Sequence, residues 1–266
     1  MRFSLRVWFT CLCVFGCVSY SENEGAAWEE VGCQEILLDH AGDWCDDVNK
    51  PFNDMKDGEF SVKGNVHFMC AHTFKVKPGK KYSFTAEVIA NEKLTKTVTC
   101  GYILSDSLHR RIHGKHYLCL PDSLTELAAP ATEEQDFILV KNNPKWMNRG
   151  TQGFNLVAFN VKADFGDLPN MEISSQIKSV VEEGGNLKVI FDKMLYKKYP
   201  AGTLVRIHGN APFYFIAGRV FPNEQWQKVG GAFDFPANAE YFYPCLIYYG
   251  DKDKVVKFRN MRLVVD

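Results

Sequence analysis

The closing forty residues, 226–266, alternate hydrophobic and polar positions in three runs, a pattern typical of β-strands. Hydrophobic positions recur at residues 233–235, then in an aromatic and aliphatic run at 241–249, and again at 256–265. The alternation slips at Arg259 and Asn260, which predicts a β-bulge. Because strands of this kind need partners, the pattern predicts an all-β fold in which earlier strands complete the closing ones.

The same period of two appears earlier in the chain. Residues 74–76 and 82–88 flank a Pro-Gly turn at 78–79, which predicts a hairpin, and residues 98–104 repeat the alternation. No stretch before residue 120 has a helical period. The first half is therefore predicted to consist of short strands.

The middle of the chain changes character and predicts a second, smaller β unit. A polar, alanine-rich connection at 121–136 includes a predicted short helix at 123–128. Strand-like runs then follow between glycines and prolines, at 137–140, 154–161, 187–191, 204–207 and 213–216. We predict that residues 22–130 and 221–266 form one β-sandwich, and that 131–220 form an inserted β subdomain.

The first 21 residues have the features of a signal peptide. Arg2 and Arg6 precede a hydrophobic run at 7–15, and residues 19–21 offer a small-x-small cleavage site. The run is too short to span a bilayer as a helix, so we expect a secreted protein without a membrane span. An alternative is lipoprotein processing at the cell envelope, because residues 14–17 resemble a lipobox that would make Cys17 a lipid anchor.

The charge balance bears on the kind of partner to expect, and the cysteine content bears on disulfide bonds. The 31 basic and 32 acidic residues nearly balance, which gives no electrostatic reason to expect a nucleic-acid partner. Six cysteines follow the leader, and in an exported chain they predict disulfide bonds. The alternative is that some are buried thiols, because three of them lie inside strand patterns. The six are Cys33, Cys45, Cys70, Cys100, Cys119 and Cys245.

Two short motifs carry a resemblance to a known family. They are Phe74-x-Val76-x-Pro78-Gly79-x-x-Tyr82-x-Phe84 and, far downstream, Glu224-x-Trp226 followed by Lys228-Val229 and Phe233. Together they resemble the galactose-binding-like jelly rolls found as carbohydrate-binding modules beside bacterial glycoside hydrolases. The resemblance covers residues 28–120 and 221–266, and implies a jelly-roll β-sandwich that binds a polysaccharide or other glycan.

The chain departs from that family in two places. Where such modules often carry two aspartates in the last strand, this chain has Arg259-Asn260, so the calcium site or acidic contact that aspartates would support is not implied. The segments 163–170 and 199–208 resemble an insertion found in uncharacterised exported bacterial proteins, which implies no activity. Within the second segment, Arg206 and His208 are predicted to point to one face of a strand.

Sugar recognition needs flat hydrophobic faces that stack on pyranose rings, with polar groups around the ring edge. Trp44 lies in a polar loop, and Trp146 lies in another that also holds Asn148 and Arg149. We predict these four residues as the ligand-binding set. The alternative for each tryptophan is a place at the rim of the core. Trp28 and Trp226 belong to strand patterns, and we expect both in the core.

Two acid-rich stretches supply oxygen ligands suited to calcium, although neither has EF-hand spacing. They are Asp43, Asp46 and Asp47, and Asp164, Asp167 and Asn170. The histidines of a basic segment are predicted to form a solvated turn rather than a metal site, namely His109, His113 and His116.

No catalytic motif is evident. Serine-hydrolase elbows, HExxH and phosphate loops are absent from the sequence. The function predicted from the sequence is therefore that of a secreted, non-catalytic, carbohydrate-binding β-sandwich protein. The alternatives are an exported structural or adhesive domain that binds other proteins, and a polysaccharide-degrading enzyme.

Overall fold

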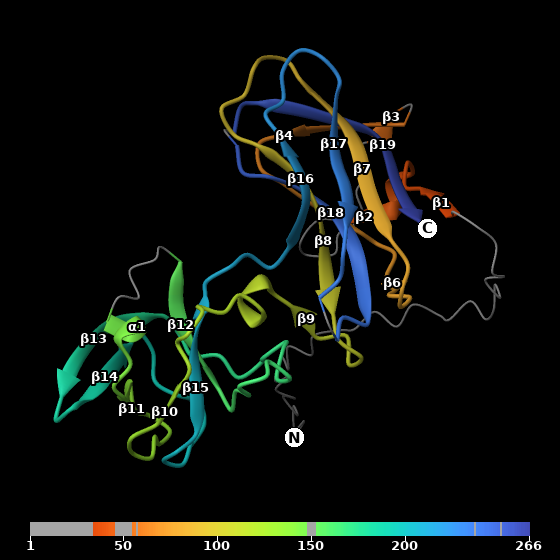
Figure 1. Ribbon diagram of the computed structural model, residues 1–266. Helices are drawn as coiled ribbons and strands as arrows, with labels where there is room; N and C mark the ends of the chain where they lie inside the picture. Colours follow the sequence, from red (N-terminus) through yellow and green to blue (C-terminus); the bar gives the residue numbers. More distant parts are fainter. Residues whose placement is uncertain (1–33, 46–54, 57, 148–152, 237, 251) are drawn as a thin grey trace, which may run out of the picture. The chain divides into compact units, whose positions relative to one another are not determined.

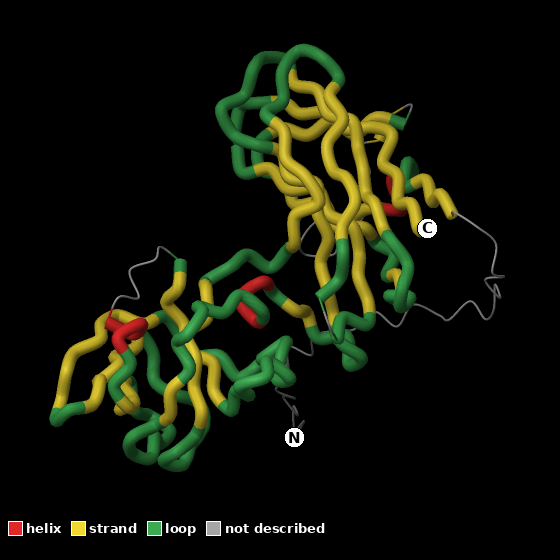
Figure 2. The backbone as a smooth tube through the Cα atoms, viewed as in Figure 1, coloured by secondary structure: helices red, strands yellow, loops and turns green. Residues whose placement is uncertain are grey.

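The fold is all-β, as predicted (Figure 2). The computed structural model describes residues 34–45, 55–56, 58–147, 153–236, 238–250 and 252–266, so the predicted signal peptide and Trp28 lie outside the described residues. Helix in this part of the chain is limited to α1 (Pro144–Met147) and two 3-10 turns, η1 (Ala41–Asp43) and η2 (Gly114–His116). No helix within the described ranges is long and hydrophobic enough to cross a bilayer.

The closing strand organises the first antiparallel sheet, in which β19 pairs with β7 on one side and with β4 and β1 on the other (Figure 1). The strand order is β17-β7-β19-β4-β3. The bounds are β1 (Gln34–Leu37), β3 (Met55–Lys56), β4 (Glu59–Lys63), β7 (Tyr82–Ala90), β17 (Gln227–Phe233) and β19 (Val255–Val265). The predicted bulge is confirmed, because the register of β19 against β7 shifts between Arg259 and Arg262.

The second antiparallel sheet has the order β16-β8-β18-β5-β2, with β6 paired to β18 and β9 paired to β8. The bounds are β2 (Trp44–Cys45), β5 (Val66–Cys70), β6 (Phe74–Lys75), β8 (Val98–Ser105), β9 (Arg111–Ile112), β16 (Phe215–Val220) and β18 (Tyr241–Tyr248). The predicted hairpin across Pro78-Gly79 is wrong. Strand β6 pairs with β18, whereas β7 belongs to the first sheet. The turn therefore carries the chain from one sheet to the other, and both strands still face a hydrophobic core.

That core lies between the two sheets. Along β7 buried and partly buried positions alternate strictly, and its inward side chains Phe84 and Val88 share one buried cluster with Cys100 and Leu246 of the second sheet. Trp44 joins this cluster, with its ring centre 6.1 Å from that of Phe84. The second sheet also buries its other face, where Tyr214 packs in a smaller cluster with Met69, Ile103, Cys245 and Ile247. Because hydrophobic clusters cover both faces of the second sheet, β8 is buried along its whole length.

The middle of the chain forms two three-stranded antiparallel sheets with a core of their own. Their orders are β10-β15-β12 and β11-β14-β13. The bounds are β10 (Thr125–Glu126), β11 (Phe137–Lys141), β12 (Phe154–Phe159), β13 (Ile177–Glu183), β14 (Asn186–Phe191) and β15 (Leu204–Gly209). We call this part the insert.

The pairing places the insert earlier in the chain than the sequence suggested. Residues 125–126 are a strand of the insert, so the short helix predicted at 123–128 is wrong. The strand expected at 213–216 is instead β16, which pairs with β8 of the second sheet. The insert therefore lies between β9 and β16 in chain order.

The cysteines do not form the predicted disulfides within the described residues, and Cys33 lies outside them. No disulfide joins the others, and Cys70, Cys100 and Cys245 are buried thiols, which was the alternative expectation. Cys100 belongs to the core between the sheets, whereas Cys245 belongs to the cluster on the opposite face of the second sheet. Burial raises the pKa of the Cys70 thiol to about 12 and that of Cys245 further, so both stay protonated.

Candidate functional site

The two tryptophans predicted to stack on sugars are both in the core. Trp44 is 1% exposed and Trp146 is 0% exposed. Each indole nitrogen donates a 2.8 Å hydrogen bond to a backbone carbonyl, of Leu38 and Ser123 respectively. A buried indole presents no face to a ligand, so the expected stacking platforms are not present at these positions. The companion residues Asn148 and Arg149 lie outside the described residues.

The predicted calcium stretches hold turns and ion pairs instead of an open ligand set. Asp43 accepts the His40 backbone N–H at 2.9 Å and lies 2.8 Å from His72 Nε2, while Asp164 accepts the Gly166 N–H. Asp46 and Asp47 lie outside the described residues. Within the ranges that the structure describes, no three His, Cys, Asp or Glu side chains are grouped to hold a metal ion.

The basic segment is only in part the predicted solvated turn, because it also contains strand β9 and the 3-10 turn η2. His109 adopts a left-handed conformation with φ of 56° and stacks on Tyr241 with ring centres 4.5 Å apart. His116 is buried and accepts the backbone N–H of His113 on Nδ1. The rings of His113 and His116 lie 5.3 Å apart, whereas the ring of His109 packs on Tyr241.

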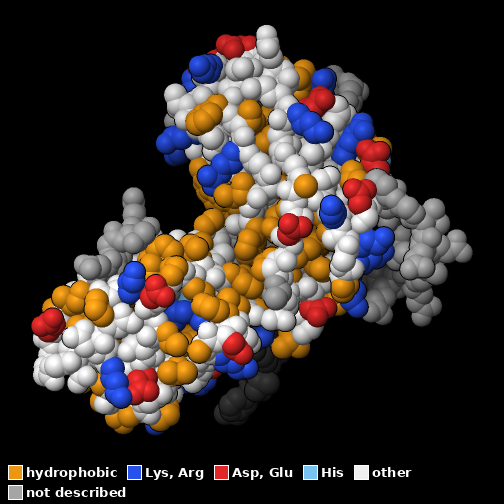
Figure 3. All heavy atoms as spheres, viewed as in Figure 1, with side chains coloured by type: hydrophobic (Ala, Val, Ile, Leu, Met, Phe, Trp, Pro, Cys, Tyr) orange, Lys and Arg blue, Asp and Glu red, His pale blue; other side chains and the backbone are white. Residues whose placement is uncertain are grey.

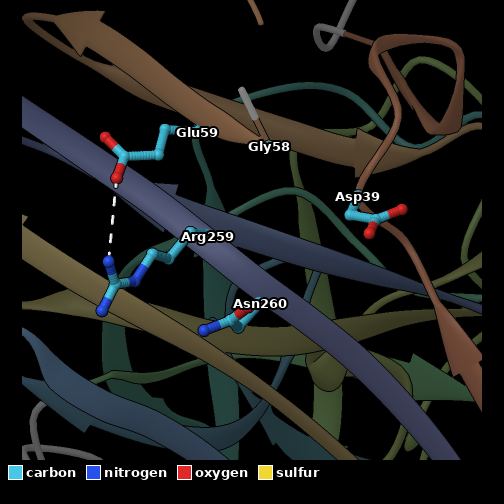
Figure 4. A pocket seen from close by; sticks show the side chains of 5 residues that line it. All are labelled: Asp39, Gly58, Glu59, Arg259 and Asn260. Carbon is cyan, nitrogen blue, oxygen red and sulfur yellow. Dashed lines mark ion pairs between the residues drawn. The ribbon is translucent and has the colours of Figure 1, made fainter. Parts of the chain in front are cut away.

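An open pocket of about 320 Å³ lies on the solvent face of the first sheet. Its lining residues are Asp39, Gly58, Glu59, Arg259 and Asn260. Figure 4 shows Glu59 and Arg259 turned toward each other, with Asn260 beside Arg259 and Asp39 at the other end. The pocket therefore combines a guanidinium, an amide and carboxylates at one place on a rigid sheet.

The β-bulge is what brings Arg259 and Asn260 together. In a regular strand successive side chains point to opposite faces, and Phe258, before the bulge, is fully buried. Asn260 adopts a left-handed conformation with φ of 51°, which asparagine tolerates better than most residues, and Met261 after it is again fully buried. The extra residue of the bulge thus leaves two consecutive polar side chains on the solvent side.

Arg259 is held by partners on three other segments. Its Nε donates a 2.7 Å hydrogen bond to Glu87 of β7, and its Nη1 lies 3.7 Å from a carboxylate oxygen of Glu59 on β4. Its guanidinium carbon lies 3.9 Å from the ring centre of Trp226, the residue before β17. The hydrogen bond from Arg259 holds the pKa of Glu87 below its ordinary value. The guanidinium of Arg259 and the indole of Trp226 beneath it thus form a flat, charged surface beside the pocket, which we call the platform.

A second polar cluster lies in the insert, where Arg206 and His208 point to one face of β15, as the sequence predicted. Arg206 donates from Nη2 to Asp167 at 2.9 Å and from Nε to His208 Nε2 at 3.3 Å. The Phe165 ring covers the guanidinium, with the carbon 4.7 Å from the ring centre. Asp167, one of the predicted calcium ligands, is therefore committed to a buried ion pair.

The cluster also contains a thiol–imidazole contact, Cys119 Sγ to His208 Nε2 at 3.4 Å. The other imidazole nitrogen, Nδ1, lies 2.8 Å from the Lys115 carbonyl oxygen. A proton on Nδ1 leaves Nε2 as the acceptor, and the Nε–H of Arg206 already occupies it. Burial raises the pKa of Cys119 above its ordinary value. Because the Cys119 thiol is protonated and Nε2 of His208 already accepts a hydrogen bond from Arg206, this pair favours a structural role over that of a nucleophile and its base.

No protein-family model matches this chain, and no curated protein matches its sequence. The site residues Trp226, Glu87 and Glu59 were missed by sequence reasoning. The bulge was the signal that marked Arg259 and Asn260, but their partners come from strands brought together by long-range pairing. Trp226, expected in the core, is in fact half-buried.

Proposed function

We propose that this protein is a non-catalytic carbohydrate-binding protein whose ligand binds on the solvent face of the first sheet. One observation carries the proposal: Arg259 lies over Trp226, between Glu87 and Glu59, beside an open polar pocket. Sugars offer hydroxyl donors and acceptors around a ring whose faces are less polar. A planar platform bordered by fixed carboxylate and amide groups is complementary to that chemistry.

We further propose that the two outer sheets form a jelly roll of the galactose-binding-like kind. The strand order supports this. The main strands of the two sheets follow the orders β4-β19-β7-β17 and β5-β18-β8-β16. Apart from the two-residue β6, which stays in the sheet of β5, the chain alternates between the sheets from β4 to β8 and again from β16 to β19. In a jelly roll two Greek keys produce this alternation. The insert would then be a long connection between the fourth and fifth strands of the roll.

Binding is proposed in preference to catalysis because Glu87 and Glu59, which both contact Arg259, are paired with cations. A glycosidase needs one carboxylic acid kept protonated near neutral pH and a second carboxylate opposite it. Glu87 has a lowered pKa because Arg259 donates to it, and Glu59 faces both Arg259 and Lys257. The environment of Glu87 therefore does not favour the protonated form that a general acid needs.

Export through the 1–21 segment remains part of the proposal, either as secretion or as lipid anchoring at Cys17. Mass spectrometry of the mature N-terminus distinguishes the two. An N-terminus near residue 22 supports secretion, and a diacylglyceryl group on Cys17 supports an envelope lipoprotein.

A protein-binding or adhesive role is the second candidate. It is favoured by large hydrophobic side chains on the insert surface, of which Met194 is 65% exposed, Tyr196 60% and Phe165 51%. On the face of β7, β17 and β19, by contrast, acidic and basic side chains are interspersed (Figure 3). A protein partner would therefore be expected on the insert and a sugar on the first sheet.

A glycan-array screen tests the proposed function. The protein is applied with and without calcium, beside the Trp226→Ala variant as a control for the site. We expect saturable binding to a defined class of sugar that Trp226→Ala weakens. A folded protein that binds no glycan, or binds equally well without Trp226, would overturn the proposed function or its site, respectively.

A further inference from the structure

The cations around the pocket are already paired with carboxylates. Arg259 has Glu87 and Glu59 as partners. Lys257 Nζ lies 3.8 Å from the second oxygen of Glu59. On the same strand, Arg262 Nη1 lies 2.8 Å from Glu35 of β1. A ligand that carries a carboxylate or a sulfate would therefore have to compete with protein carboxylates for the guanidinium and ammonium groups of Arg259, Lys257 and Arg262.

One pocket carboxylate is left over. Asp39 has a side chain 40% exposed, and among the described residues it pairs with the imidazole of His40, whose Nε2 lies 3.5 Å from Oδ1. No Lys or Arg of the described part of the chain forms an ion pair with it. Asn260, beside Arg259 in the same pocket, is also exposed. Among the described residues, Asp39 is thus the pocket carboxylate that lacks a Lys or Arg partner.

These observations concern the ligand of the proposed function and rest on it. We infer that the pocket recognises a sugar bearing a protonated amine, such as a glucosamine oligomer, with the ammonium group facing Asp39 and the ring hydroxyls facing Glu59 and Asn260. An ammonium supplies three donors and the missing positive charge. A uronic acid or a sulfated sugar places a negative charge at the same point and is disfavoured.

Four probes separate charge from ring recognition. They are a glucosamine hexamer, its N-acetylated counterpart, a galacturonic acid hexamer and pentalysine, each titrated at low salt and mildly acidic pH by calorimetry. One exposed ion pair corresponds to about a fivefold difference in Kd. We expect the amine form to bind about fivefold more tightly than the N-acetyl form, and the difference to shrink at high salt. The galacturonate and pentalysine are expected to bind most weakly.

The Asp39→Asn variant tests the assigned partner. It removes the charge and keeps the shape, so we expect it to bring the ratio between the affinities of the amine and N-acetyl forms close to one. Glu183→Gln removes an acid from β13 of the insert and serves as the matched control, for which the ratio is expected to stay unchanged.

The outcomes distinguish the two levels of the proposal. Equal binding of the amine and N-acetyl forms, tighter binding of galacturonate, or an unchanged ratio in Asp39→Asn would overturn the charge preference and leave the proposed function standing. Pentalysine binding as tight as the glucosamine hexamer would show that the amine is recognised without the ring, which also overturns the inference. No binding of any sugar, in these titrations and on the array, would overturn the proposed function itself.

Discussion

The guanidinium of Arg259 lies over the indole ring of Trp226, 3.9 Å from its centre, although 33 positions of sequence separate the two residues. The arginine belongs to β19 and the tryptophan precedes β17, and β7 lies between these strands. Glu87 of β7 receives the Nε–H of the same arginine. The contacts of Arg259 therefore connect three strands on the solvent face of the sheet. On that face the platform contributes little to the packing of the core.

Removing the platform is expected to affect binding more than folding. Trp226→Ala and Arg259→Ala should each weaken binding of the best array glycan at least about tenfold, the range expected for loss of a central aromatic or arginine contact. Each should lower the free energy of unfolding by only about 1 kcal/mol, because partly exposed ion pairs and cation–π contacts are weak. Calorimetry and urea unfolding measure the two effects separately. A large loss of stability with unchanged affinity would assign the pair to the fold alone.

The buried tryptophans should behave in the opposite way. Trp44→Phe and Trp146→Phe remove an indole N–H that satisfies a buried carbonyl, and each leaves unfilled volume. Each is expected to cost roughly 1–3 kcal/mol of stability and to leave glycan affinity unchanged. Urea unfolding and the same titration check this, and a stable variant with lost affinity would show that the ring has a direct role in binding.

Two adjacent glycines of β17 offer a matched test of the strand pairing. Gly230 has φ of +99°, and a Cβ there would meet the Phe84 carbonyl oxygen and lie 2.8 Å from Cys100 Sγ. Gly231 has no such strain, and its Cβ would lie 3.5 Å from its nearest contact, the Ala217 oxygen. Gly230→Ala is expected to lower the free energy of unfolding by about 2 kcal/mol or more. Gly231→Ala should change it by less than about 1 kcal/mol. Equal effects in chemical denaturation would contradict the register of β17 against β7.

The insert should lose stability in mild acid. Burial lowers the pKa of His208 to about 4, from an ordinary value of 6.5, and Arg206 Nε–H already occupies the nitrogen that a proton would take. His116 is likewise lowered to about 4, chiefly by burial. Both are neutral in the folded chain at pH values where the unfolded chain binds protons. Their contribution is therefore fully present above about pH 6.5 and is lost as pH falls toward 4.

For His208 the full loss is roughly 3 kcal/mol between pH 7 and pH 4. The free energy of unfolding, measured in urea at several pH values, should fall as the pH is lowered through this window. His208→Gln should make its dependence on pH less steep, by up to the equivalent of one proton bound on unfolding. A slope that does not depend on His208 would contradict the buried, neutral assignment.

Sequence pattern was sufficient for many of the strands, although β4, β5 and β13 were not predicted. The closing strands, the bulge at Arg259-Asn260 and the common face of Arg206 and His208 follow from a period of two, because that period is set by local backbone geometry. The pairing of β6 did not follow. The residues of β6 and β7 alternate in the same way, and only the second sheet's β18, more than 160 positions away, decides where Phe74 lies.

The candidate site was harder to predict for the same reason. Trp44 and Trp146 sit among polar residues in sequence, but neighbours in sequence do not decide burial, and both rings fill the core. Arg259 depends on Glu87, Glu59 and Trp226, which approach it only through sheet pairing. Cysteine count likewise suggested disulfides, whereas strand direction places Cys100 and Cys245 on opposite faces of one sheet.

The most direct test of the central claim is an NMR titration that follows the indole N–H signals of the tryptophans, assigned with Trp→Phe variants. The glycan that binds most tightly on the array is added to the isotope-labelled protein. We predict a saturable shift of the Trp226 signal, with the signals of Trp44 and Trp146 unmoved because both rings are buried. A saturable shift at Trp44 or Trp146 with none at Trp226, or no shift with any glycan, would contradict sugar binding on the face of the first sheet.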